Sequence, residues 1–193
     1  TELVTSVDLV KEQIRIAEGK KLSFKQKDLK QNGSAIEVRL YAENPNNDFL
    51  PEIGKIKALS YPNLNAIRWD IGIKKNDVIT PNFDPMLAKV ISFAPNRIDA
   101  ASKLAKALES AHIGGVKTNR DFLINCLKSP EFLKGNTTTD FIERVNPDRK
   151  LIINESDLNH AAVIAALWIQ RKNRDEAKVA KFMPSGWTNG RLP

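Results

Sequence analysis

The sequence predicts an α+β fold, in which helices pack on an antiparallel sheet of short strands. After one N-terminal helix, segments with strand patterns come first, between residues 34 and 93. Segments with helical patterns follow, between residues 96 and 145. Strands and helices do not alternate along the chain as they do in βαβ units, and this argues against a parallel sheet. With 193 residues, the chain is long enough for one full core and a second small piece.

The clearest strand lies between residues 33 and 43, where apolar residues alternate strictly with charged or aromatic residues. Such alternation predicts a half-buried strand, because successive side chains point to opposite faces of a sheet. A stiff strand would hold the Arg39 guanidinium between two carboxylates and beside a phenol. The expected buried residues are Ile36, Val38, Leu40 and Ala42, and the expected outward residues are Glu37, Arg39, Tyr41 and Glu43.

The other segments are consistent with the same fold. A helix capped by Thr5 or Ser6 is expected over residues 7–17 and should end at Gly19. Short strands are expected at residues 55–59, 66–70 and 77–80, and a longer buried strand at 86–93. Later helices are expected at residues 96–112, 119–128, with Thr118 as its N-cap, and 139–145.

The composition changes at Asn146-Pro147-Asp148, and we expect a domain boundary there. The sequence thus predicts one domain over residues 1–146 and a second region over residues 147–193. An alanine-rich helix with a large apolar face is expected at residues 158–169, and it needs a partner surface. We expect the tail from about Lys172 onward to be poorly ordered.

Composition narrows the functional classes. There is no run of about 18 apolar residues and no signal-peptide pattern, so we expect a cytoplasmic protein, or a mitochondrial matrix protein in a eukaryote. The net charge of +7 raises the question of nucleic-acid binding, but only residues 11–30 are visibly enriched in lysine. Because of this net charge, we keep a non-catalytic basic module that binds protein or nucleic acid as the alternative function.

The sequence offers few groups for metal or nucleophilic chemistry. His112 and His160, the only histidines, each fall on an expected helix without cysteine or carboxylate neighbours at metal-ligand spacing. Gly114-Gly115 lacks the ending of a phosphate-binding loop and indicates a helix stop. Cys126 cannot form an internal disulfide, and its helical apolar pattern predicts a small core residue.

Five blocks of the sequence occur in an order and spacing that a known family shares. They are residues 1–5, residues 33–56, Asp-Pro-Met-Leu-Ala-Lys at 84–89, Gly-Val-Lys-Thr-Asn at 115–119, and the series Phe132, Gly135 and Thr137. Together they resemble the C-terminal domain of biotin carboxylase, found in the biotin-containing alpha subunit of acyl-CoA carboxylases. Residues 184–193 are similar to the start of the carrier-tethering region that follows this domain.

The resemblance implies a fold of the biotin carboxylase C-terminal domain type and a part in a ligase. That ligase carboxylates carrier-bound biotin with bicarbonate and ATP. In the family, ATP and Mg²⁺ are bound by ATP-grasp domains that precede the position of Thr1, so we expect the isolated chain to be inactive. The other implied partners are the biotin carboxyl carrier domain and the carboxyltransferase subunit. Neither a membrane nor nucleic acid is expected.

The resemblance places Arg39 at the position that contacts the biotin ureido oxygen and phosphate. Arginine suits this role because its charge is permanent and its donors are held in a plane. By periodicity alone, the better interpretation is a surface residue paired with Glu37 or Glu43. With the family match, Glu37 becomes the expected orienting carboxylate, and Glu43 and Tyr41 are weaker candidates.

Three further positions carry expectations. Asp84 should support the site by fixing the start of a buried strand rather than by transferring a proton. Arg68 and Asp70 belong to a region that helps form a subunit interface in some relatives, and an intramolecular ion pair is the alternative. Ser34 stands where the family usually has histidine, which puts in doubt any hydrogen bond that the histidine makes.

Overall fold

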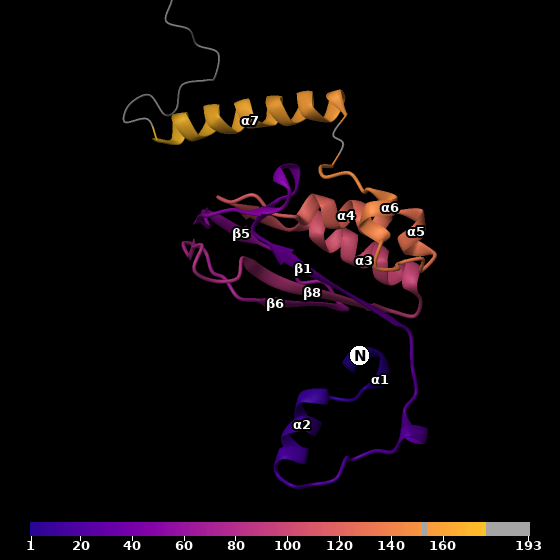
Figure 1. Cartoon of the computed structure of the whole chain (residues 1–193). Helices are drawn as coiled ribbons and strands as arrows, with labels where there is room; N and C mark the ends of the chain where they lie inside the picture. Colours follow the sequence, from indigo (N-terminus) through magenta and orange to yellow (C-terminus); the bar gives the residue numbers. More distant parts are fainter. Residues whose placement is uncertain (152–153, 177–193) are drawn as a thin grey trace, which may run out of the picture. The chain divides into compact units, whose positions relative to one another are not determined.

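The computed structural model describes residues 1–151 and 154–176. The chain divides into two compact units, with the boundary after Leu151. The first unit contains a three-stranded antiparallel sheet with helices on one face, together with three smaller two-stranded ladders (Figure 1). The predicted α+β class is confirmed.

The central sheet has the strand order β1 (Ser34–Tyr41), β8 (Met86–Ala94) and β6 (Ile67–Ile71). Both neighbouring pairs are antiparallel. Along β1, Ile36 and Leu40 are buried and Glu37 and Arg39 are exposed, as predicted, whereas Val38 and Tyr41 are both half-buried. One face of this sheet therefore packs in the core, and the other carries exposed charged residues.

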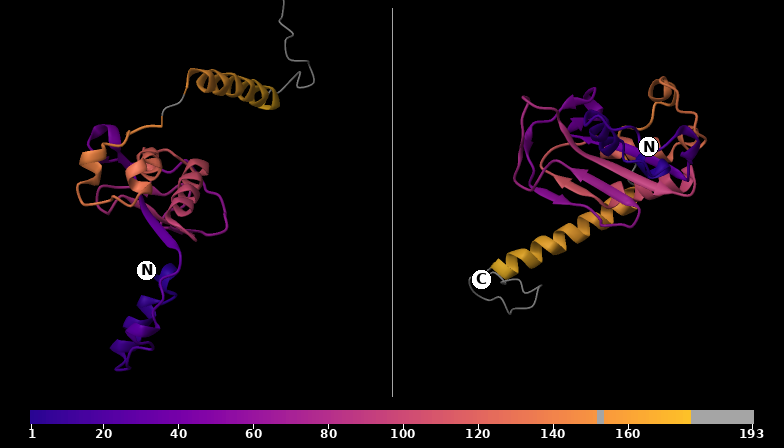
Figure 2. Two further views of the ribbon diagram at one scale, coloured as in Figure 1. Left: turned by 90° about the vertical axis from the view of Figure 1, so that its right-hand side faces the viewer. Right: turned by 90° about the horizontal axis from the view of Figure 1, so that it is seen from below.

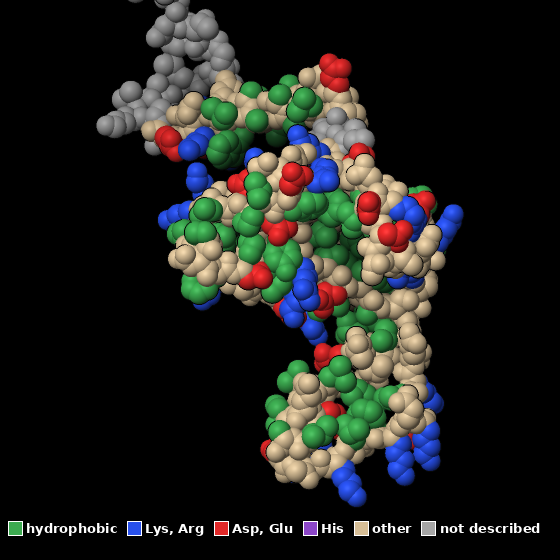
Figure 3. Space-filling model, in the orientation of Figure 1, with side chains coloured by type: hydrophobic (Ala, Val, Ile, Leu, Met, Phe, Trp, Pro, Cys, Tyr) green, Lys and Arg blue, Asp and Glu red, His purple; other side chains and the backbone are tan. Residues whose placement is uncertain are grey.

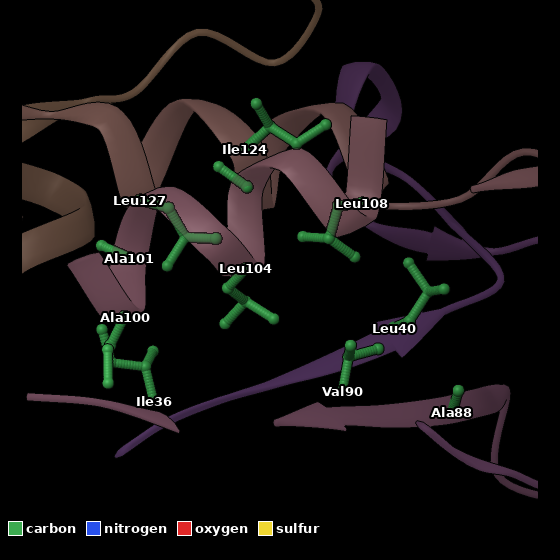
Figure 4. Close-up of a cluster of buried hydrophobic side chains, with 12 residues drawn as sticks. Ile36, Leu40, Ala88, Val90, Ala100, Ala101, Leu104, Leu108, Ile124 and Leu127 are labelled. Carbon is green, nitrogen blue, oxygen red and sulfur yellow. The ribbon is translucent and has the colours of Figure 1, made fainter. Parts of the chain in front are cut away.

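The core lies between the sheet and two helices, α3 (Arg97–Ser110) and α4 (Arg120–Lys128). Leu40 and Val90 from the sheet belong to one cluster with Leu104 and Leu108 of α3 and Ile124 of α4, and each of the five is 0% exposed (Figure 4). Full burial of one such side chain stabilises a fold by about 1.5–3 kcal/mol. This layer holds β1 and β8 in place.

α3 follows its sequence signals closely but not completely. Asn96 caps it, since its Oδ1 accepts the Asp99 N–H at 2.9 Å. The prediction that Ile98 lies on the buried stripe is wrong, because this side chain is 57% exposed. The helix also ends at Ser110, and His112 lies in the strand β9 (His112–Gly114) rather than on the helix. The reason is that Ala111 adopts an extended conformation, which lets the chain pair with β5.

The short strands pair in three ladders. These are β2 (Glu43–Asn44) with β3 (Leu50–Pro51), β4 (Gly54–Lys55) with β7 (Val78–Ile79), and β5 (Ala58–Ser60) with β9. Gly115 lets these ladders approach each other, because it has a φ of +112° and a Cβ there would overlap the Lys55 carbonyl oxygen. The single strand predicted at residues 55–59 is wrong, because Ile56 and Lys57 separate β4 from β5.

The N-terminal part contains α1 (Glu2–Thr5), α2 (Leu9–Ala17) and a 3₁₀ turn, η1 (Gln26–Asp28). The cap predicted at Thr5 or Ser6 is wrong. Asp8 caps α2, since its Oδ1 accepts the Lys11 N–H at 3.0 Å. Ser6 instead takes a left-handed φ of 59° that ends α1.

Three elements surround the C-terminal end of this unit: α5 (Pro130–Leu133), α6 (Phe141–Val145) and the 3₁₀ turn η2 (Pro45–Asn47). α5 was not expected, because Pro130 predicts the end of a helix. Here it starts a new one, since proline is well suited to the first helical position. The N-cap of α4 is Asn119 and not Thr118, so this predicted cap is wrong by one residue.

The second unit is described through α7 (Glu155–Glu176), which is longer than the predicted 158–169. The helix continues through residues 172–176, and the Arg171–Asp175 and Lys172–Glu176 ion pairs lie along this last part of it. The rest of the tail from Lys172, with residues 184–193, lies outside the described residues. None of the described helices has the length and apolar character to span a bilayer.

Candidate functional site

Charged side chains gather on the face of the central sheet opposite the core. Arg39, Lys89 and Asp70 form one cross-strand row, and Glu37 and Arg68 belong to the next row. Directly opposed residues have Cβ atoms about 4.5–5.5 Å apart, so these groups influence one another's charge. We call these five residues the charged sheet face. The right-hand view of Figure 2 looks from below toward the side of the sheet that α3 and α4 leave uncovered.

Arg39 is the most open of the predicted site residues. Its side chain is 65% exposed, and its Nε lies 4.0 Å from Glu37 Oε1. An exposed ion pair of this kind contributes about 0–1 kcal/mol to stability. The structure thus brings Arg39 and Glu37 together, and the fold does not depend on the guanidinium.

Arg68 differs from Arg39, although both lie on the charged sheet face. Arg68 Nη2 lies 3.2 Å from Asp70 Oδ2, and Nη1 lies 3.3 Å from Glu2 Oε2. Two carboxylates therefore engage Arg68 at short distance, whereas Arg39 has one loose partner. The intramolecular ion pair considered for Arg68 and Asp70 is present.

Asp84 acts on the backbone at the start of β8. Its Oδ1 accepts the Met86 N–H at 2.8 Å, two residues further along the chain. Burial, followed by the negative charge of Asp84, raises the pKa of the Glu43 carboxyl above its usual value. In the described structure no hydrogen bond or ion pair joins Asp84 to Arg39 or Glu37, so Asp84 lies with Glu43 at the edge of the site.

Asn119 is the residue near this site whose contacts sequence reasoning missed. Its carboxamide accepts the Tyr41 N–H at 2.9 Å and donates to the Arg39 carbonyl oxygen at 3.2 Å. Its backbone N–H donates to the Tyr41 carbonyl oxygen at 3.2 Å. Asn119 stands in a block that matches the family, but a contact across 78 residues has no signal in a local pattern.

The remaining candidate groups do not form a reactive centre. Cys126 is buried, and this burial raises its pKa to about 12, so its thiol stays protonated in the core. Among the described residues, no three histidine, cysteine or acidic side chains are placed to hold a metal ion together. A cavity of about 480 Å³ is lined in part by His112, Lys117 and Arg120, and not by Arg39. The Arg39 side chain, 65% exposed, lies on an open surface outside this cavity.

Comparison with known proteins gives a consistent family. The model of the biotin carboxylase C-terminal domain matches residues 37–144. Biotin carboxylase 2 of Bacillus subtilis is 43% identical over 144 residues, which are 75% of this chain and 32% of that protein. The mitochondrial methylcrotonoyl-CoA carboxylase subunit alpha of Mus musculus is 36% identical over 199 residues, 99% of this chain and 28% of that protein.

Solved structures agree with the sequence matches. The biotin carboxylase domain dimer of the Hydrogenobacter thermophilus 2-oxoglutarate carboxylase, crystallised with MgADP, ADP and bicarbonate, has a TM-score of 0.74 at 39% identity. That match covers 79% of this chain and 34% of the other. The chain spans about a third of the length of these relatives. The matched range contains Glu37, Arg39, Asp84 and Asn119, and more than half of the chain. By sequence and by fold, the chain belongs to the biotin carboxylase C-terminal domain family.

Proposed function

We propose that this chain forms one wall of the biotin site of an ATP-dependent biotin carboxylase, within an acyl-CoA carboxylase. The observation that carries the proposal is the exposed Arg39 guanidinium, presented by a strand whose opposite face is fixed in the core. The carboxylase relatives support it, because the matched range includes this strand from Glu37 onward. We also propose that residues 1–146 act as the domain, and that residues 147–193 contain a linker, a helix and the start of a carrier-tethering region.

Arg39 has the chemistry that carboxylation of biotin requires. The ureido nitrogen of biotin must lose its proton to a base, which in this family is the phosphate formed when carboxyphosphate collapses, and negative charge then develops on the ureido oxygen. A guanidinium stabilises that charge through planar N–H donors that remain protonated at every working pH. Glu37, 4.0 Å away, orients the guanidinium without enclosing it. Lys89, opposite Arg39 in the same row, adds positive potential.

The second wall of the site and the nucleotide belong to a different part of the enzyme. The Hydrogenobacter relative was crystallised with MgADP and bicarbonate. By the resemblance to this family, we assign ATP and Mg²⁺ to ATP-grasp domains that complete the enzyme. The proposed partners are those domains, the biotin carboxyl carrier domain and the carboxyltransferase subunit.

Asp84 has a supporting role in this proposal. Its carboxylate accepts the Met86 N–H and so fixes the backbone where β8 begins. β8 is the strand that carries Lys89 beside Arg39. Glu43 and Tyr41 are assigned no direct contact with biotin.

The alternative, a basic module that binds protein or nucleic acid, has no support from the relatives. Figure 3 shows acidic and basic side chains interspersed over the visible face of the part that contains the sheet, whereas basic side chains gather at one side of the N-terminal part. The face that carries Arg39 thus lacks the continuous basic surface that is typical of nucleic-acid binding. A salt-sensitive mobility shift with DNA or RNA would revive this alternative.

The proposal is tested by adding the ATP-grasp part of the Bacillus subtilis relative to the full chain, in trans or fused, and measuring biotin-dependent ATP turnover. Arg39→Ala should lower turnover about 10²–10³-fold, the usual cost of removing one donor to a developing oxyanion. The matched control is Arg171→Ala, since Arg171 is also exposed, at 78%, with one carboxylate 3.8 Å away. It should leave turnover unchanged. Equal turnover in both variants would contradict the proposal.

A further inference from the structure

β1 has an open edge at the position of Arg39. In the sheet order β1-β8-β6, β1 pairs with β8 on one side, and no described strand pairs with its other side. Backbone groups at such an edge usually face water or another chain. Arg39 and Tyr41 are two residues apart, so their backbone N–H and C=O groups point to the same edge.

Asn119 occupies this edge in the way that a neighbouring strand would. Its carboxamide offers one acceptor and one donor in a plane, as a peptide group does, and it binds the Tyr41 N–H and the Arg39 carbonyl oxygen. The Asn119 backbone N–H adds the third hydrogen bond, to the Tyr41 carbonyl oxygen. Three hydrogen bonds from one residue thus converge on the backbone beside the Arg39 side chain.

The Asn119 carboxamide makes its hydrogen bonds to β1 and none to the first turn of α4. Asn119 is the N-cap of α4, where asparagine normally accepts a hydrogen bond from the first turn. Here it makes no side-chain capping bond. The residue is only 6% exposed, so water has little access to replace its bonds to β1 if they are lost.

The hydrogen bonds of Asn119 reach β1 where its pairing with β8 is irregular. The ladder between β1 and β8 loses its regular register between Leu40 and Tyr41, where Leu40 faces Ala88 but Tyr41 faces Met86. An irregularity of this kind changes the direction of nearby side chains. Leu87 has no partner on β1 in this register, so regular pairing with β8 is interrupted after Leu40, and the bonds from Asn119 hold the backbone from Arg39 to Tyr41 at the other edge.

We propose that Asn119 is a positioning residue for Arg39. By holding the backbone from the Arg39 carbonyl to Tyr41, it keeps the guanidinium in one orientation toward the site. This inference rests on the proposed role of Arg39 in biotin carboxylation. It assigns Asn119 no contact with biotin itself.

The test uses Asn119→Asp in the full chain, supplied with the ATP-grasp part as above. Aspartate has the same shape and still accepts from the Tyr41 N–H, but it cannot donate to the Arg39 carbonyl oxygen. Biotin-dependent turnover should fall about 10–100-fold, the scale expected when a catalytic group is misplaced by an ångström or less. The matched control is Asn125→Asp on the same helix, whose amide donates to the Asp148 and Lys150 carbonyl oxygens at 2.8 and 2.9 Å. It should retain wild-type turnover.

A double variant separates positioning from a general structural effect. If Asn119 acts through Arg39, Asn119→Asp should cause no further loss in an Arg39→Ala background. The same fold-loss with and without Arg39 would overturn the inference and leave the proposed function standing. Full turnover in Arg39→Ala alone would instead overturn the proposed function, and with it any role of Asn119 that depends on Arg39.

Amide hydrogen exchange of the isolated full chain gives a readout that needs no activity. Asn119→Ala removes the acceptor of the Tyr41 N–H, and exchange at Tyr41 should accelerate about 5–10-fold, as expected for one lost hydrogen bond. Asn119→Asp should keep Tyr41 protected because its carboxylate still accepts. Equal protection of Tyr41 in wild type and in a folded Asn119→Ala variant would overturn the inference.

Discussion

In β1, Ile36 and Leu40 are 7% and 0% exposed, whereas in α7 Leu158 and Trp168 remain 59% and 62% exposed. Both segments carry a strong apolar pattern. The apolar side of β1 packs against α3 within the first unit, whereas no described residue of α7 is buried within the second unit. The difference teaches that a pattern predicts which face of an element is apolar, and that burial requires a partner surface as well.

The polar sides of the two elements also differ. Arg39 of β1 and Arg171 of α7 are both exposed, each with one carboxylate about 4 Å away. Of the two, only the Arg39 backbone is held by the core on the opposite face of its sheet and by Asn119 at the strand edge. A candidate site is thus distinguished by the support beneath the side chain rather than by the side chain alone.

The largest difference between the two elements is expected for a leucine on each. Leu40→Ala opens a cavity in the core and should lower the free energy of unfolding by about 2–5 kcal/mol. Leu167→Ala, at a position 59% exposed, should change it by less than about 0.5 kcal/mol. Urea unfolding followed by circular dichroism measures both. Similar losses in the two variants would show that α7 is buried as deeply as β1.

A smaller difference is expected between polar groups on the two faces of the central sheet. Ser92 of β8 is 0% exposed, and its hydroxyl donates to the Ala100 carbonyl oxygen at 2.8 Å. Ser92→Ala should therefore cost about 0.5–1.5 kcal/mol of unfolding free energy. Glu37→Gln on the charged sheet face should cost less than about 0.5 kcal/mol, because its ion pair is exposed. The comparison of the faces breaks down if the order of these two costs is reversed in urea unfolding.

Glu43, at the edge of the site, should make the free energy of unfolding depend on pH. Burial, and then the charge of Asp84, raises the pKa of Glu43 above its usual 4.5, so the folded state favours its protonated form. The corresponding stability is present below pH 4.5 and is lost as the pH rises through the raised pKa. Glu43→Gln should flatten the stability profile between pH 4.5 and neutrality, measured by urea midpoints. Parallel profiles for both proteins would contradict this assignment.

The smallest signal is expected from Cys126 on α4, behind the core. Since burial raises its pKa to about 12, the thiol should resist iodoacetamide in the native chain at mildly alkaline pH. It should react once urea unfolds the protein. Rapid labelling of the native chain would place Cys126 on an accessible surface.

Local patterns in the sequence were sufficient for the central sheet. The alternation of β1, the apolar run of β8 and the cap of α3 at Asn96 each depend on residues close together in the chain. Errors arose where a local signal had two possible outcomes. Pro130 can end a helix or begin one, and Ile98 fits a helical stripe at a position where the helix faces solvent.

The candidate site was predictable only in part. Alternation placed Glu37 and Arg39 on one face, and the structure brings them together. The hydrogen bonds of Asn119 to Arg39 and Tyr41 join residues 80 and 78 positions apart, and such contacts exist only once α4 has packed beside β1. The position of Arg68 between Asp70 and Glu2 has the same origin, because Glu2 lies 66 residues away.

The most direct test of the account is the biotin-dependent ATP turnover of Arg39→Ala, in a preparation whose urea midpoint matches that of the wild type. The account predicts a loss of about 100-fold or more with no loss of stability, because the guanidinium is exposed and weakly paired. Undiminished turnover in this folded variant would contradict the claim that the charged sheet face serves biotin.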